Sequence, residues 1–174
     1  MAMTNIDLLN DSIRKRRYKE TLIRIIETED LNIQGYLGFL PLVEASGMRP
    51  SNRMDITKII GYLVKNGADV NAKDAHGWTP LMNAAATNCI VNIAILVQFG
   101  ADLDIQDHEG RTALMLAAGW GKLQAAKTLV NYGADVGIRD FSGELAWQHA
   151  YQGGSNRCMN FLSQETLYHF SGLA

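Results

Sequence analysis

The sequence predicts an all-α solenoid, a row of helical repeats with short turns or hairpins at its tips. Three sets of markers recur with a period of 33 residues, and their agreement indicates internal repetition. Each repeat supplies a turn, two short helices and an extended return, which is the kind of unit that stacks into a solenoid. The markers are Asp74, Asp107 and Asp140; Gly77, Gly110 and Gly143; and the Gly-Ala-Asp tripeptides that begin at Gly67, Gly100 and Gly133.

Length and composition fit one globular domain. The chain has 174 residues, of which 47% are hydrophobic and 20% charged, enough apolar side chains for a core. The net charge is −2, so no field over the whole chain attracts nucleic acid or an anionic membrane. Cys89 and Cys158 lie 69 positions apart without a C-x-x-C pair, which excludes a disulfide-rich scaffold.

No targeting or membrane segment is expected. The first residues contain no apolar run of signal-peptide length. The long uncharged stretch between Asp74 and Asp102 is interrupted by Pro80 and several amides, so its apolar runs are too short to span a bilayer. We therefore expect a cytoplasmic protein, with a nuclear protein or a secreted effector as alternatives.

The first two repeats are the least regular. Residues 4–29 have the pattern of a capping repeat, with a helix, a basic turn and a second helix. In the repeat at 30–68, Leu40 lies 39 rather than 33 residues before Thr79, so six extra residues separate its helices. This insertion, 47–55, is either functional, as long loops often are, or a tolerated addition that costs little chain entropy.

The two central repeats, 69–101 and 102–134, are the most regular. Their Asp-x-x-Gly sequences are typical of type I turns. Thr79 followed by Pro80 predicts a helix N-cap with proline at the first helical position, and Thr112 caps the next copy. Apolar residues at helical spacing predict the second helices: Ile90, Ile93, Leu96 and Val97, then Leu123, Ala126, Leu129 and Val130.

The last repeat, residues 135–174, departs from this pattern. Leu145-Ala146-Trp147 replaces the Thr-Pro-Leu of the central copy. Trp147 falls on the position of a core leucine, so we expect it in the core. Met159 and Leu162 continue the pattern of a second helix. Terminal repeats are expected to be atypical, since one face of each meets water.

The central copies resemble the ankyrin repeat, whose motif is roughly D-x-x-G-x-T-P-L-H-x-A-A. The matching segments are Asp74-Ala-His-Gly-Trp-Thr-Pro-Leu-Met-Asn-Ala-Ala85 and Asp107-His-Glu-Gly-Arg-Thr-Ala-Leu-Met-Leu-Ala-Ala118. The resemblance implies five repeats, two of them caps. It also implies that a histidine supports each turn by hydrogen bonding, but Met82, Met115 and Gln148 occupy that position here. We expect methionine to be a poor substitute in that role.

The resemblance also implies a non-enzymatic module that binds a partner protein, as adaptor or inhibitor. Such proteins bind through their turn tips and the inner face of their first helices. Large aromatic rings on such a surface predict an interface, although they could instead pack sideways against neighbouring repeats. We expect a monomer and an unidentified protein partner. The candidate partner-binding residues are Tyr36, Phe39, Ala75, His76, Trp78, Thr87, His108, Glu109, Arg111, Trp120 and Phe141.

The alternative is a nucleic-acid-associated or nuclear regulatory protein that uses the basic run 14–19 together with Arg49 and Arg53. Residues 1–29 carry six bases and five acids, so the local positive charge is largely offset. We therefore favour a solvated face of the capping repeat.

No catalytic or metal-binding residues are predicted. The spacing and turn position of Asp74, Asp107 and Asp140 give them a structural explanation. The four histidines show no ligand spacing with the two cysteines. We expect no enzyme activity, no cofactor and no metal.

Overall fold

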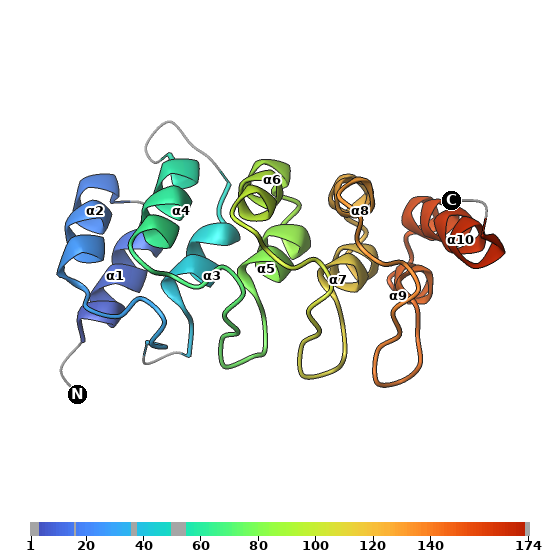
Figure 1. Cartoon of the computed structure of the whole chain (residues 1–174), viewed down its shortest axis with the longest axis horizontal. Helices are drawn as coiled ribbons and strands as arrows, with labels where there is room; N and C mark the ends of the chain where they lie inside the picture. Colours follow the sequence, from blue (N-terminus) through green and yellow to red (C-terminus); the bar gives the residue numbers. More distant parts are fainter. Residues whose placement is uncertain (1–3, 16, 36–37, 50–54, 173–174) are drawn as a thin grey trace.

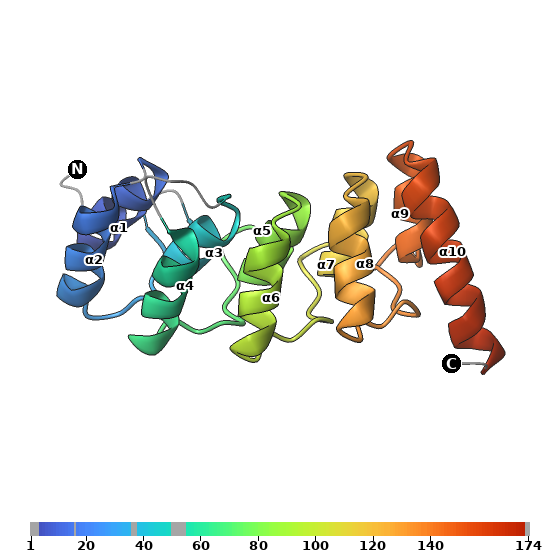
Figure 2. The same cartoon turned by 90° about the horizontal axis from the view of Figure 1, so that it is seen from above.

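The computed structural model describes residues 4–15, 17–35, 38–49 and 55–172. These residues form ten α-helices and no strand, and the helices lie in one elongated row with the two termini at opposite ends (Figure 1). Seen from above, the even-numbered helices lie side by side along the row (Figure 2). The helices are α1 (Asn5–Arg14), α2 (Tyr18–Glu27), α3 (Pro41–Ser46), α4 (Ile56–Lys65), α5 (Pro80–Ala86), α6 (Ile90–Gln98), α7 (Ala113–Gly119), α8 (Leu123–Asn131), α9 (Ala146–Gln152) and α10 (Asn156–Ser171).

Each central repeat begins as its sequence predicts. The Thr79 hydroxyl accepts a hydrogen bond from the Met82 N–H, and Pro80 occupies the first turn of α5. The chain reverses between α5 and α6 at Asn88, whose φ is 58°, and between α7 and α8 at Gly121, whose φ is 65°. Asparagine and glycine are the residues that adopt this left-handed backbone at least cost.

The methionines in the histidine position do support the helix starts. The Thr79 N–H donates to Met82 Sδ at 3.4 Å, and the Thr112 N–H donates to Met115 Sδ at 3.5 Å. Both methionine side chains are 1% exposed, so no water competes for these N–H groups. In the last repeat the Leu145 N–H donates to Gln148 Oε1 at 2.9 Å. The expectation that methionine would be a poor substitute is therefore wrong, since a buried thioether sulfur is an adequate weak acceptor.

One continuous core runs through all five helix pairs. Ala84, Ala85, Ala117 and Ala118 are fully buried, and their small side chains let α5, α7 and α9 pack closely. Trp147 packs against the edge of this core and stays partly exposed. Its expected core position is thus confirmed only in part, because the described chain places no further helix pair over it.

The start of the insertion is held by the following repeat. Asn92 of α6 is fully buried, and its amide donates to the carbonyls of Ser46 and Met48 at 2.9 and 2.8 Å. Cys89 is buried beside them as a free thiol, as the sequence predicts. Burial raises the pKa of the Cys89 thiol, which disfavours a reactive thiolate. Residues 50–54, including Arg53, lie outside the described part of the chain.

Candidate functional site

The aspartates that recur every 33 residues shape the tips of the repeats. Asp107 Oδ1 accepts the N–H groups of Glu109 and Arg111, both at 2.9 Å. Asp74 and Asp140 make the same pair of bonds to their own tips. A buried carboxylate with two backbone donors fixes each turn, so the structural explanation of these aspartates is confirmed.

Neighbouring tips are in direct contact. The Ala75 N–H donates to the Gly38 carbonyl at 3.0 Å, and the Phe141 N–H donates to the Glu109 carbonyl at 3.1 Å. At Gly110, an added Cβ would lie 2.5 Å from the Phe141 nitrogen, so only glycine permits this approach. We call residues 75–78, 108–111 and 141–144 the tip row, the loops that project downward in Figure 1.

The tip row carries most of the predicted binding residues. Ala75, His76, His108, Glu109 and Phe141 are exposed. Phe141 is 74% exposed, the largest fraction among the large apolar side chains of the described residues.

Trp78 and Arg111 are less available than the sequence suggests. Trp78 is half-buried and packs against the core. Arg111 donates to Asp107 Oδ2 through Nε at 2.9 Å, and its Nη1 lies 2.8 Å from Glu109 Oε2. These two side chains stabilise the tips as much as they present a surface.

At the N-terminal end, the predicted residues form an internal stack. The rings of Phe39 and His76 lie parallel with their centroids 5.1 Å apart, and the Arg14 guanidinium lies 5.1 Å from the Phe39 centroid. Arg14 also makes two hydrogen bonds to Glu44, at 2.7 and 3.0 Å, and these raise its pKa. Tyr36 lies outside the described residues.

The basic run is largely engaged within the chain. Arg14 is bound to Glu44, Lys15 Nζ lies 2.8 Å from Asp11, and Arg17 lies 3.0 Å from Glu20. Arg16 lies outside the described residues. Side chains committed to carboxylates are poor phosphate ligands, which argues against the nucleic-acid alternative.

Trp120 is the most prominent predicted residue on the first helices. It follows α7 directly and is 62% exposed. Thr87 has the same place after α5, but it is half-buried and its hydroxyl donates to the Asn83 carbonyl at 2.9 Å. The two positions are equivalent in the repeat, yet only Trp120 offers a large free side chain.

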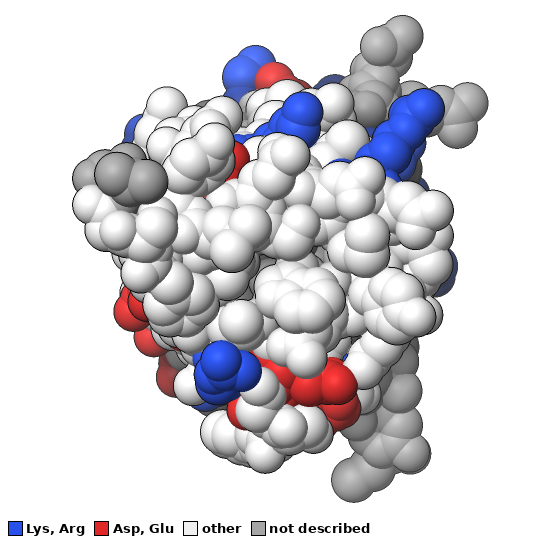
Figure 3. All heavy atoms as spheres, turned by 90° about the vertical axis from the view of Figure 1, so that its right-hand side faces the viewer, with Lys and Arg blue, Asp and Glu red and all other residues white. Residues whose placement is uncertain are grey.

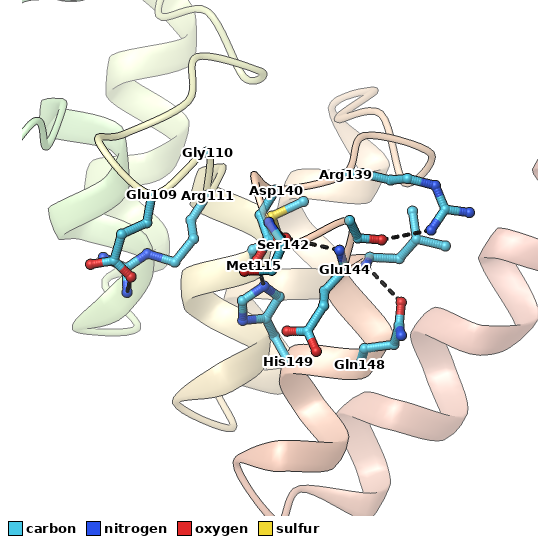
Figure 4. A network of polar contacts seen from close by, with 12 residues as sticks. Glu109, Gly110, Arg111, Met115, Arg139, Asp140, Ser142, Glu144, Gln148 and His149 are labelled. Atoms are coloured by element: carbon cyan, nitrogen blue, oxygen red, sulfur yellow. Dashed lines mark hydrogen bonds and ion pairs between the residues drawn. The ribbon is translucent and has the colours of Figure 1, made fainter.

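One polar cluster in the last repeat was missed by sequence reasoning. His149 Nε2 lies 2.9 Å from Asp140 Oδ2, and Gln152 Nε2 donates to Glu144 Oε1 at 2.6 Å (Figure 4). Burial raises the pKa of Asp140, but hydrogen bonds from the Glu144 and Ser142 N–H groups and from His149 outweigh it, so the pKa is lowered. The spacing D-x₃-E-x₄-H was the available signal, but a search for histidines near cysteines could not find it.

The C-terminal end of the row presents a second apolar surface. This end, formed by α9 and α10, is largely uncharged (Figure 3). Tyr151 lies one period after Ala118, which is buried next to α9, whereas Tyr151 is 68% exposed. Leu167, Tyr168 and Phe170 of α10 are exposed as well.

Comparison with known families agrees with this architecture. No helix in the described part of the chain has both the length and the apolarity that crossing a membrane requires. A search of curated proteins finds no match. A family model described as ankyrin repeats, in three copies, matches residues 48–140, more than half of the 174 residues. With the period, the capped helix pairs and the stacked tips already established, this match shows that the chain belongs to the ankyrin-repeat family.

Proposed function

We propose that this chain is a non-enzymatic module that binds a partner protein through the tip row and Trp120. Ankyrin repeats are generally protein–protein interaction modules. The observation that carries the proposal is the exposure of two large rings, Phe141 at 74% and Trp120 at 62%, on positions where similar proteins bind.

The energetic basis is the apolar area of these rings. A fully covered aromatic side chain buries about 150–250 Å², and aromatic side chains are frequent anchors of protein interfaces. Phe141 stands on a tip whose backbone is fixed by Asp140 and by the bond to Glu109. A partner therefore meets a preformed surface, which lowers the ordering cost of binding.

The polar groups of the tip row would complete the contact. His108 and Glu109 are exposed beside Phe141 and can form hydrogen bonds at the rim of an interface. Arg111 and Trp78 hold the tips in shape beneath them. In this proposal the chain acts as an adaptor or an inhibitor, and it works in the reducing cytoplasm, where Cys89 and Cys158 stay free thiols.

The proposal is tested by affinity capture from a nuclease-treated lysate of the source cells, followed by mass spectrometry. Wild type is compared with the double variant Trp120→Ala, Phe141→Ala. Tyr151→Ala is the matched control, because it removes an exposed ring from the end of the row instead. Helicity by circular dichroism confirms that each variant folds.

We expect a protein that wild type and Tyr151→Ala retain and the double variant loses at least tenfold. Equal retention by all three would overturn the assignment to the tip row and Trp120. Loss with Tyr151→Ala alone would move the site to the C-terminal end.

A further inference from the structure

We propose that Asp140, Glu144 and His149 bind one divalent transition-metal ion of the zinc type. One possible ligand atom from each side chain lies within 4.8 Å of the other two. Asp140 lies in the turn, Glu144 in the segment that returns to the helix, and His149 on α9 (Figure 4). This site does not depend on the proposed binding of a partner protein.

The distances suit a small ion. Zinc binds imidazole nitrogen and carboxylate oxygen at about 2.0–2.2 Å, which places two tetrahedral ligands about 3.3 Å apart. Asp140 Oδ2 and His149 Nε2 are 2.9 Å apart, so they need to separate by only a few tenths of an ångström. The ion takes the place of the Nε2 proton of His149, which is released to solvent.

Hydrogen bonds hold both carboxylates in place. The second oxygen of Asp140, Oδ1, accepts the N–H groups of Ser142 and Glu144 at 2.9 and 2.8 Å. Gln152 donates to Glu144 Oε1 at 2.6 Å. Such outer contacts orient metal ligands and keep their lone pairs directed at the ion.

The local charge favours a divalent cation. One repeat earlier, Arg111 occupies the position of Glu144 and neutralises Asp107. The last repeat replaces that guanidinium by a second carboxylate, which leaves two negative charges beside a neutral imidazole. Within the described ranges, His149 is the one basic side chain that forms an ion pair with Asp140 or Glu144. A divalent ion would balance these charges.

The donor set selects the kind of ion. One nitrogen and two carboxylate oxygens are suited to zinc and to neighbouring first-row ions, whereas calcium and magnesium prefer oxygen ligands alone. The side chains of His149 and Asp140 are 15% and 7% exposed, so water can reach the site and fill the remaining coordination positions.

The test uses the full chain after treatment with a chelator. Zinc chloride is titrated calorimetrically, and cobalt chloride is titrated with visible absorption, since the cobalt spectrum reports its ligands directly. His149→Gln and Glu144→Gln remove one ligand each. The matched controls are His108→Gln and Glu109→Gln, which change the same residue types on the exposed tip of the preceding repeat.

We expect one ion per chain, a cobalt spectrum typical of low coordination number, and a rise in Tm with zinc. Both ligand variants should weaken binding at least tenfold, and both controls should bind as wild type does. Absence of binding to folded wild type, or equal binding by ligand variants and controls, would overturn the proposal. A response to calcium or magnesium but not to zinc would overturn the assignment to a nitrogen-binding ion.

Discussion

The backbone N–H of Phe141 donates to the carbonyl of Glu109 at 3.1 Å, across the junction between two tips. This bond brings the Phe141 backbone against Gly110, where no side chain fits. The exposed ring of Phe141 is thus carried on a backbone that the preceding repeat holds in place. The contact links the stacking of the repeats to the presentation of the candidate binding surface.

Substitution of Gly110 by alanine should separate these two tips. A Cβ at Gly110 would lie 2.5 Å from the Phe141 nitrogen, and the residue also has a φ of 79°. Gly143 has a similar φ of 81° with no atom within 4 Å of an added Cβ, so Gly143→Ala measures the cost of the backbone conformation alone. We expect Gly143→Ala to cost about 1 kcal/mol of unfolding free energy. Gly110→Ala should cost about 1–3 kcal/mol more, because overpacking adds to it. Urea denaturation checks both values, and equal costs would contradict a close tip-to-tip contact.

The two tryptophans of the candidate site should differ in their effect on stability. Trp78 packs against the core, whereas Trp120 is 62% exposed. Trp78→Ala should lower the unfolding free energy by about 1–2 kcal/mol, part of the cost of truncating a fully buried ring. Trp120→Ala should change it by less than about 0.5 kcal/mol, as surface substitutions usually do. Similar losses in both variants, measured by urea denaturation, would show that Trp120 is packed and unavailable to a partner.

The sulfur of Met115 should contribute to stability as a hydrogen-bond acceptor. Met115→Leu keeps the apolar volume but leaves the buried Thr112 N–H without its acceptor at 3.5 Å. We expect a loss of about 1 kcal/mol in unfolding free energy. Met159→Leu is the control, since Met159 packs at the edge of the core without such a bond among the described contacts. A loss no larger than in the control would show that the sulfur only fills space.

Asp104 should make stability depend on pH. Burial, with the negative charges of Asp135 and Asp102, raises the pKa of Asp104 above its ordinary value of 3.8, although the Asp135 N–H bond opposes this. A raised carboxyl pKa means that the folded state binds the proton more tightly, so ionisation of Asp104 lowers stability as the pH rises through its folded pKa. Asp104→Asn should therefore raise the Tm at pH 7.

The hydrogen bond itself should survive this substitution. Asn71, one period earlier, already accepts the Asp102 N–H at 2.9 Å through its amide oxygen. The gain from Asp104→Asn should vanish below about pH 3.5, where Asp104 is protonated in both states. Asp30→Asn controls for the loss of one exposed negative charge. A gain that stays the same at low pH would rule out ionisation as its cause.

The sequence by itself determined the features that depend on near neighbours in the chain. The turn at Asp107 is made by N–H groups two and four residues away, and the Thr112 cap is made three residues away. Such contacts depend on residue type and spacing, and the period of 33 repeats them along the row. The ankyrin-repeat fold was therefore predictable from the residues of the central copies.

Only the tertiary structure decided which predicted residues remain available. Trp78 and Trp120 look equally suited to an interface, but the first packs against the core and the second does not. The sulfur bonds of Met82 and Met115 required burial that excludes water, and the cluster at His149 required α9 to return to its own tip. These outcomes depend on how helices and tips lie against one another, and no local spacing specifies side-chain exposure or the approach of groups from different elements.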